Sequence, residues 1–159
     1  MITGNNYGYF IPSVTQIGVG AVKIAGDQIK ALGGTKPLIV TDKGIVKVGI
    51  LKQVTDVLDA AGMKYAVFDE TIPNPTDKNV HDAVDLYKKE GCDSLITLGG
   101  GSSHDCGKGV GFVTANGGKI HGLCPGPARF PRAFLRRGAR EGPGRRGRRH
   151  RGHRTGLAV

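Results

Sequence analysis

A run of three glycines between an apolar segment and a polar one is the strongest candidate for chemistry in this chain. Gly99, Gly100 and Gly101 follow the apolar residues 95–98 and lead into Ser102. Glycine has no Cβ, so the backbone can turn tightly and approach a ligand closely. The N–H groups at the start of a helix carry partial positive charge, which suits a pyrophosphate. The run predicts a phosphate-binding turn between a strand and a helix, and a strand-to-helix turn without a ligand is the alternative that it leaves open.

Strand and helix patterns alternate along the chain on both sides of this run. Apolar residues recur at helical spacing in three stretches that each end at glycine, namely Val22, Ala25, Ile29 and Leu32, then Leu51, Val54, Leu58 and Ala61, then Val80, Ala83, Val84 and Tyr87. Short buried strands are expected at residues 37–41, 65–68 and 94–98. Such alternation indicates βαβ units, and so we expect an α/β fold with a Rossmann-like parallel sheet flanked by helices.

Polar segments follow each expected strand, at Thr41 and Asp42, at 69–76 and at 99–105. In parallel sheets, ligands bind outside the carboxyl ends of the strands. Asp42 is placed to accept hydrogen bonds from an adenosine ribose, which favours NAD over NADP, and a helix-capping aspartate is the alternative. The acidic residue precedes the glycines and the Gly-x-Gly-x-x-Gly pattern is absent, so the plain Rossmann fingerprint does not describe this site.

Three motifs together resemble one family. Residues 39–44 (Ile-Val-Thr-Asp-Lys-Gly), residues 73–76 (Pro-Asn-Pro-Thr) and residues 99–102 with Asp105 and Lys108 are similar to the N-terminal nucleotide-binding domain of iron-containing (group III) alcohol dehydrogenases. The fuller strings resemble the branch that contains 1,3-propanediol and NAD-dependent methanol dehydrogenases. The resemblance runs from about residue 9 to 121. It implies a dehydroquinate-synthase-like N-terminal domain and NAD(H)-dependent hydride transfer between a primary alcohol and an aldehyde.

The resemblance also implies which residues surround NAD. Asp42 would face the adenosine ribose, and Asn74 would lie beside the cofactor. The pyrophosphate would be held by Gly100, Gly101 and Ser102. Asp105 would lie toward the nicotinamide and the substrate. Gly107 stands where the family usually has alanine. We expect this difference to cost about 1 kcal/mol of helix propensity and to leave the phosphate contacts unchanged.

The resemblance implies that full-length members of the family bind iron. A second, all-helical domain would supply one Asp and three His ligands. We expect no such domain in this chain, assign it no catalytic and no metal-ligating residue, and expect the chain alone to be inactive. We interpret His81 as a solvated helix residue and His104 as a turn residue near the phosphate; His150 and His153 have no carboxylate ligand near them. Full-length members of the family are oligomeric.

The basic residues divide the chain into two parts. All 12 lysines lie between Lys23 and Lys119, and all 11 arginines lie between Arg129 and Arg154. Residues 1–121 balance 12 lysines with 12 acidic residues, whereas residues 122–159 set 11 arginines against Glu141 alone. Arg, Gly, Pro and Ala make up 27 of these last 38 residues, and all four are read from GC-rich codons. We therefore expect an incomplete NAD-binding domain over 1–121 and a disordered tail over 122–159 that is a frameshift product.

A genuine Arg/Gly-rich arm is the alternative interpretation of the tail. Such an arm would bind nucleic acid through its guanidinium groups, and any polyanion could bind there without sequence preference. The chain would then be a non-enzymatic binding protein rather than an alcohol dehydrogenase.

Composition favours a cytoplasmic protein. The N-terminus lacks the basic and apolar regions of a signal peptide, and no apolar run approaches the ~20 residues that cross a bilayer. Cys92, Cys106 and Cys124 form no Cys-x-x-Cys pair, and their odd number fits free thiols. We expect no membrane contact.

Overall fold

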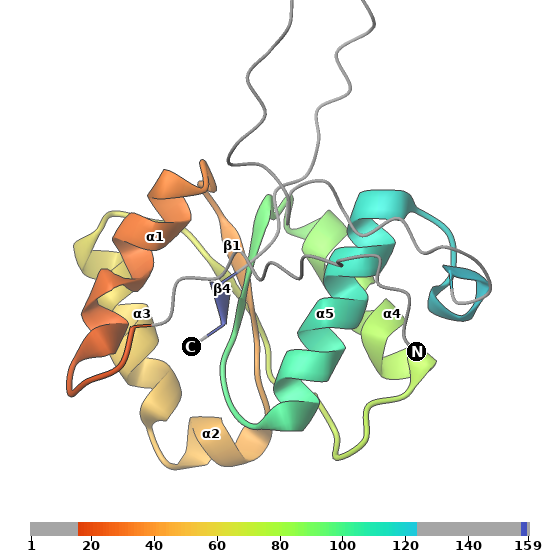
Figure 1. Ribbon diagram of the computed structural model, residues 1–159, viewed down its shortest axis with the longest axis horizontal. Coiled ribbons are helices and arrows are strands. Elements are labelled where there is room, and N and C mark those ends of the chain that lie inside the picture. The colour runs from red at the N-terminus through yellow and green to blue at the C-terminus, as the bar shows by residue number, and fades with distance from the viewer. Residues whose placement is uncertain (1–15, 124–156, 159) are drawn as a thin grey trace, which may run out of the picture.

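A parallel α/β sheet flanked by helices forms the body of the molecule, as the sequence predicts (Figure 1). The computed structural model describes residues 16–123 and 157–158. Its elements are η1 (Ala21–Ile24), α1 (Ala25–Ala31), β1 (Pro37–Val40), α2 (Lys43–Lys47), α3 (Ile50–Ala60), β2 (Ala66–Phe68), α4 (Asp77–Lys89), β3 (Ser94–Thr97), α5 (Gly101–Asn116), η2 (Ile120–Leu123) and β4 (Leu157–Ala158). The strand order is β2-β1-β3-β4, and all three pairings are parallel.

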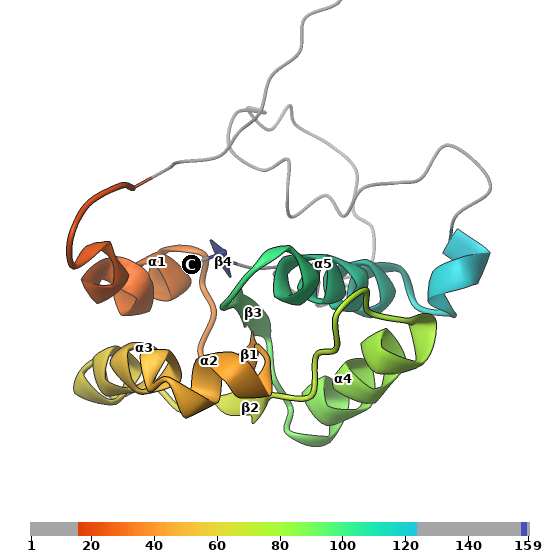
Figure 2. The same cartoon turned by 90° about the horizontal axis from the view of Figure 1, so that it is seen from below.

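Helices cover both faces of the sheet. Figure 2 shows α1 and α3 on one face and α4 and α5 on the other. All four residues of β1 and all four of β3 are buried, because a strand covered on both faces has no side open to water.

The alternation of side chains along each strand divides the core in two. Leu38 of β1 and Leu95 of β3 pack with α4 and α5, whereas Ile39 and Ile96 pack with α1 and α3. The predicted helical stripes supply the opposing side chains, such as Val84 of α4, which is 1% exposed. The first predicted stripe is the least regular, since a 3₁₀ turn over Ala21–Ile24 precedes α1.

A carboxylate fixes the turn that leads into β1. Asp93 accepts hydrogen bonds from the backbone N–H of Thr35 at 2.8 Å and of Lys36 at 3.0 Å, and from the Thr35 hydroxyl at 2.6 Å. Burial by itself would raise the pKa of Asp93, but hydrogen bonds from Thr35, Lys36 and Ser94 outweigh burial and hold this pKa below its ordinary value. The charged carboxylate thus stabilises the folded turn.

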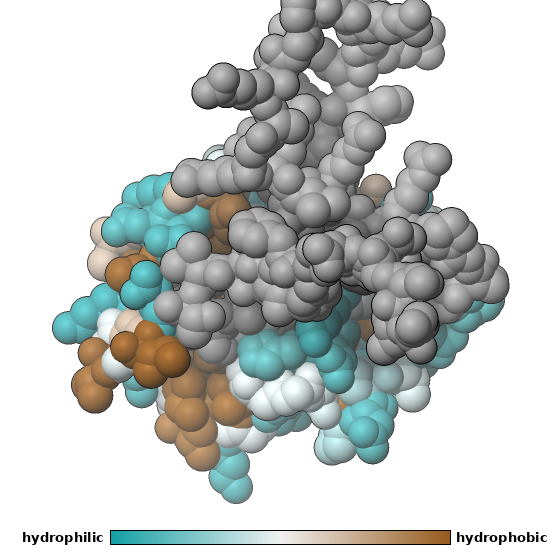
Figure 3. Space-filling view, viewed as in Figure 1, coloured by the Kyte–Doolittle hydropathy of each residue, from teal (hydrophilic) through white to brown (hydrophobic). Residues whose placement is uncertain are grey.

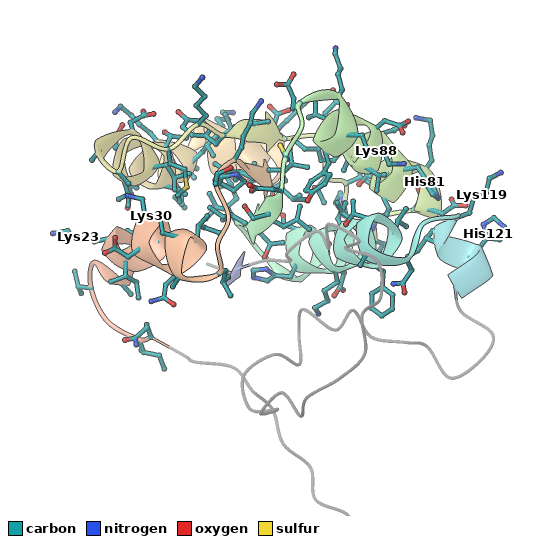
Figure 4. All side chains as sticks on the ribbon, turned by 90° about the horizontal axis from the view of Figure 1, so that it is seen from above. Lys23, Lys30, His81, Lys88, Lys119 and His121 are labelled. Carbon is teal, nitrogen blue, oxygen red and sulfur yellow. The ribbon has the colours of Figure 1, made fainter. Side chains whose placement is uncertain are left out.

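The end of the first described range packs on α4. The backbone N–H of Ile120 donates to His81 Nε2 at 3.3 Å, and His121 Nδ1 lies 3.9 Å from a carboxylate oxygen of Asp77. Figure 4 shows His81, Lys119 and His121 together at this end of the molecule. His81 is therefore a half-buried acceptor for η2, and the expectation of a solvated helix residue was incomplete.

Two residues of the expected tail lie in the sheet. Leu157 pairs with Ile96 and Ala158 with Thr97 in the short parallel strand β4. The rest of the expected tail from residue 124 on, with its arginines and Cys124, lies outside the described residues, and so do 1–15. Within the described part of the chain, no helix is long and apolar enough to cross a membrane.

Candidate functional site

The carboxyl ends of β1 and β2 are joined directly by backbone hydrogen bonds. The N–H of Thr41 donates to the carbonyl of Phe68 at 2.8 Å, and the N–H of Thr71 donates to the carbonyl of Thr41 at 3.2 Å. Asp42 and Glu70 then form an isolated antiparallel bridge. These bonds hold the segment after β1 against the loop after β2, at the lower edge of the sheet in Figure 1, where α2 and α5 begin.

A pocket of about 440 Å³ opens at this edge. The start of α2, the loop after β2 and the start of α5 supply its lining, which consists of Asp42, Lys43, Gly44, Thr71, Ile72, Pro73, Gly100, Gly101, Ser102 and Ser103. Four of the six residues predicted around the cofactor line this one pocket, since Asp42 and residues 100–102 all belong to it.

The Asp42 side chain accepts two hydrogen bonds from its own chain within this pocket. Its Oδ1 accepts from the N–H of Ile45 at 3.0 Å and so caps α2, and its Oδ2 accepts from the Ser103 hydroxyl at 3.2 Å. The alternative of a helix-capping aspartate is therefore what the side chain does in this structure. Each carboxylate oxygen can accept two hydrogen bonds, so the cap leaves acceptor capacity for a further donor.

The start of α5 is open toward the same pocket. No side chain caps this helix at Gly100, so the N–H groups of its first turn lack a capping partner. A Cβ added at Gly100 or Gly101 would meet no atom within 4 Å. At Gly99, by contrast, a Cβ would lie 2.8 Å from Ser103 Oγ, and the φ of +135° also requires glycine. Gly99 thus allows the turn, while the next two glycines leave space in front of the helix.

Asn74 and Asp105 lie differently from the other predicted residues. The backbone N–H of Asn74 donates to Ser102 Oγ at 3.3 Å, so Asn74 is beside the pocket although outside its lining. Asn74 also has a φ of +52°, unusual for a residue other than glycine. Asp105 is exposed on α5 and pairs with Lys108 at 3.0 Å, away from the lining.

Several residues of the site were missed from the sequence. Lys43 and Ser103 line the pocket next to predicted residues. Asn79, which is 7% exposed, accepts from the N–H of Ile72 at 3.3 Å and donates to the carbonyl of Glu70 at 2.9 Å, so it holds the loop after β2. Thr76 in the sequence could have indicated where α4 begins and so where Asn79 lies, because threonine is a favoured helix N-cap. Its side chain caps the helix at the N–H of Asn79.

His104 lies within α5 rather than in a turn, and it is not among the residues that line this pocket. Its Nδ1 lies 2.7 Å from Thr97 Oγ1 at the end of β3, which orients the half-buried imidazole. The nearby thiol of Cys106 is buried, and burial raises its pKa, so it is protonated at neutral pH.

The described residues do not fit a metal ion such as iron. Among them, no three His, Cys, Asp or Glu side chains gather closely enough to hold one.

The fold is that of an α/β domain with a parallel sheet, and the pocket lies at the carboxyl edge of that sheet beside an uncapped glycine-rich helix start, which is where such domains commonly bind ligands. Residues 12–135 match the model of the iron-containing alcohol dehydrogenase family. The chain belongs to this family. The match extends past residue 121, where the sequence analysis places the end of the resemblance.

One relative and two solved structures show how much of the family is matched. The NAD-dependent methanol dehydrogenase of Bacillus methanolicus is 45% identical over 113 residues, which are 71% of this chain and 30% of that protein. The crystal structure of a 1,3-propanediol oxidoreductase matches with a TM-score of 0.71 at 39% identity, over 75% of this chain and 31% of that one. The sulfoacetaldehyde reductase of Bifidobacterium kashiwanohense, solved with NAD⁺, matches with a TM-score of 0.68 at 26% identity, over 76% and 31%. This chain thus spans about a third of its relatives.

Proposed function

We propose that the pocket binds NAD(H) and that the chain is the cofactor-binding part of an alcohol dehydrogenase that interconverts primary alcohols and aldehydes. One observation carries the proposal, namely that an uncapped helix start and the carboxylate of Asp42, which follows the neighbouring strand β1, line the same pocket. The names of the relatives support it, since one is NAD-dependent and another structure contains NAD⁺.

The start of α5 is suited to the pyrophosphate. Its uncapped N–H groups are free to donate to an anion, and the absence of a Cβ at Gly100 and Gly101 leaves space for phosphate oxygens to approach the backbone. Ser102 adds a hydroxyl, and the exposed Lys43 adds a positive charge to the pocket. These groups would bind and orient the cofactor. NAD, when bound, accepts or supplies the hydride.

Asp42 is suited to the adenosine ribose. Its oxygens are fixed by the α2 cap and by Ser103, so the carboxylate is already oriented to accept from ribose hydroxyls. The same negative charge would repel the 2′-phosphate of NADP. We place Asn74 beside the cofactor, through its contact with Ser102. The assignment of Asp105 toward the nicotinamide rests on the family resemblance alone.

The cellular setting that we propose is the cytoplasm, where the buried free thiols of Cys92 and Cys106 would remain reduced. The alcohol substrate is proposed only as a class, a small primary alcohol.

Asp42→Asn tests the cofactor assignment. Asparagine caps helices as well as aspartate does, so we expect the free energy of unfolding to change by less than about 1 kcal/mol. The charge is lost, however, so the ratio of the NADPH to the NADH dissociation constant should fall toward one. The two constants should be measured by calorimetry at high salt, which screens the arginines. An unchanged ratio in Asp42→Asn, or equal constants in the unmodified chain, would contradict the role of Asp42.

A further inference from the structure

A second hollow, of about 330 Å³, opens next to the pocket that contains Asp42. We call it the apolar groove, and its lining consists of Val22, Ile45, Ile50, Gln53, Val54, Leu98 and Gly99. Of these described residues, Gln53 alone has a polar side chain and none carries a charge. Figure 3 shows apolar surface at the lower left, where Figure 1 places α2 and the start of α3. A hollow of this size with a mostly apolar lining and few polar groups has the usual form of a small-molecule site.

The apolar groove and the pocket meet at the Asp42 carboxylate. The N–H of Ile45, which lines the groove, donates to Asp42 Oδ1 at 3.0 Å. A Cβ added to Gly99, which also lines the groove, would lie 3.1 Å from Asp42 Oδ2. The next residue, Gly100, already belongs to the pocket. A group attached to a ribose at Asp42 therefore lies next to the apolar groove.

Adenine is the part of NAD that is bonded to this ribose. It is flat, aromatic and uncharged at neutral pH, so it can leave water without the cost of burying a charge. The lining offers apolar contact to such a ring through Ile45, Val54 and Leu98, of which Val54 is 1% and Leu98 is 4% exposed. The chemistry of the apolar groove thus matches the base, as that of the start of α5 matches the phosphates.

Gln53 supplies the polar group of the apolar groove. It lies on α3, directly before the buried Val54, and within the described part of the chain its amide has no hydrogen-bond partner. A carboxamide both donates and accepts, so it can form two hydrogen bonds with adenine, at the amino group and at N7. Hypoxanthine has an oxygen in place of that amino group and can only accept at this edge. It would therefore lose one of the two bonds.

We propose that the apolar groove binds the adenine base of the dinucleotide and that Gln53 selects adenine through its amide. This inference rests on the proposed function, because the ribose held by Asp42 positions the base. It makes Gln53 a specificity-determining residue, since Asp42 and the start of α5 recognise the ribose and the phosphates but not the base.

Titrations of the full chain with NADH and with reduced nicotinamide hypoxanthine dinucleotide test the role of Gln53. The two ligands differ only in the base, and high salt screens the arginines. The unmodified chain should bind NADH about fivefold more tightly, which is the lower end of the discrimination from a bidentate amide–adenine pair. Gln53→Met keeps the length of the side chain without the amide, so it should bring the ratio of the two dissociation constants to about one.

Ile50→Asn tests the apolar groove itself, because it makes one side of the lining polar at the exposed start of α3. This variant should weaken NADH binding severalfold and leave the binding of inorganic pyrophosphate unchanged. Val48→Asn is the matched control, since Val48 is also an exposed apolar residue but lies outside the lining. It should leave both affinities unchanged. Circular dichroism verifies the fold of each variant.

Equal dissociation constants for the two dinucleotides in the unmodified chain would overturn the inference, and this comparison needs no variant. A preference that Gln53→Met leaves intact, or NADH binding that Ile50→Asn leaves intact, would overturn it as well. In each of these cases NADH still binds, so the proposed function stands. A folded chain that binds neither dinucleotide would overturn the proposed function and this inference with it.

Discussion

At the scale of single residues, the glycines of the pocket differ in whether the fold itself requires them. Gly99 has a positive φ and a close neighbour in Ser103, so the turn itself requires it. Gly101 has neither, because a Cβ there would meet no atom within 4 Å. The fold therefore does not explain Gly101, whereas the proposed close approach of a phosphate would explain it.

Gly101→Ala tests this distinction. Alanine is the better helix former, so the free energy of unfolding should be unchanged or should rise by up to about 1 kcal/mol. The methyl group should nevertheless weaken NADH binding, because it occupies space in front of the first N–H groups of α5. Urea unfolding and an NADH titration of the same sample measure the two effects. Unchanged affinity would show that the ligand does not approach this backbone.

The sequence predicted part of the site because strand ends and glycine runs are visible in it. Asp42 and residues 100–102 could be placed at one edge as soon as β1 and β3 were predicted to be parallel. Lys43 and Ser103 could not be selected, because their role depends on the direction in which short helices leave the sheet. That Asp42 both caps α2 and lines the pocket could not be predicted, because in the sequence the two roles stand as alternatives.

At the scale of elements, the contact between α5 and β3 is closer than helix propensity alone suggests. A Cβ at Gly107 would collide with Thr97 Cγ2, and Thr97 is held by its contact with His104. Glycine at 107 therefore serves packing, although it is the weaker helix former.

Gly107→Ala should consequently destabilise the domain, by about 1–3 kcal/mol from overpacking, rather than stabilise it. Adding Thr97→Ser removes the colliding methyl group and keeps the hydroxyl for His104, so the double variant should recover most of the loss. A double-mutant cycle in urea measures this coupling. A stable Gly107→Ala variant would mean that helix propensity dominates.

Because Asp93 anchors the turn before β1, the free energy of unfolding should depend on pH in the acidic range. Its pKa is lower in the folded state, so its contribution is present above the ordinary unfolded pKa of about 4 and is lost as the pH falls through the folded value. Asp93→Asn should cost about 1–2 kcal/mol at pH 7, since charge-assisted hydrogen bonds to Thr35 and Lys36 weaken. The difference between the two proteins should shrink as urea unfolding is repeated from pH 5 down to pH 2. A constant difference would contradict this role.

Helices and strands were predictable where one periodic signal was long. The stripes of α3 and α4 and the apolar runs of β1 and β3 are examples, and each ends at a residue that stops it. The 3₁₀ turn at Ala21–Ile24 and the strand Leu157–Ala158 were not predicted. The strand has two residues, too few for any period, and it depends on the edge of β3 for its pairing.

At the scale of the whole molecule, the chain is a family member that spans about a third of its relatives' length. Its positive charge of +10 resides in the arginines after residue 121. Those arginines attract any anion, including a dinucleotide, so binding at the pocket has to be separated from binding by charge. High ionic strength and the pocket variants make this separation.

The most direct measurement is an NADH titration of the unmodified chain at high salt. The chain has no tryptophan, so the fluorescence of bound NADH can be followed with little protein background. We predict saturable binding of one NADH per chain, competition by inorganic pyrophosphate but not by chloride at equal ionic strength, and weaker binding to Gly101→Ala. Absence of saturable binding by a chain that circular dichroism shows to be folded would contradict the assignment of the pocket to NAD(H).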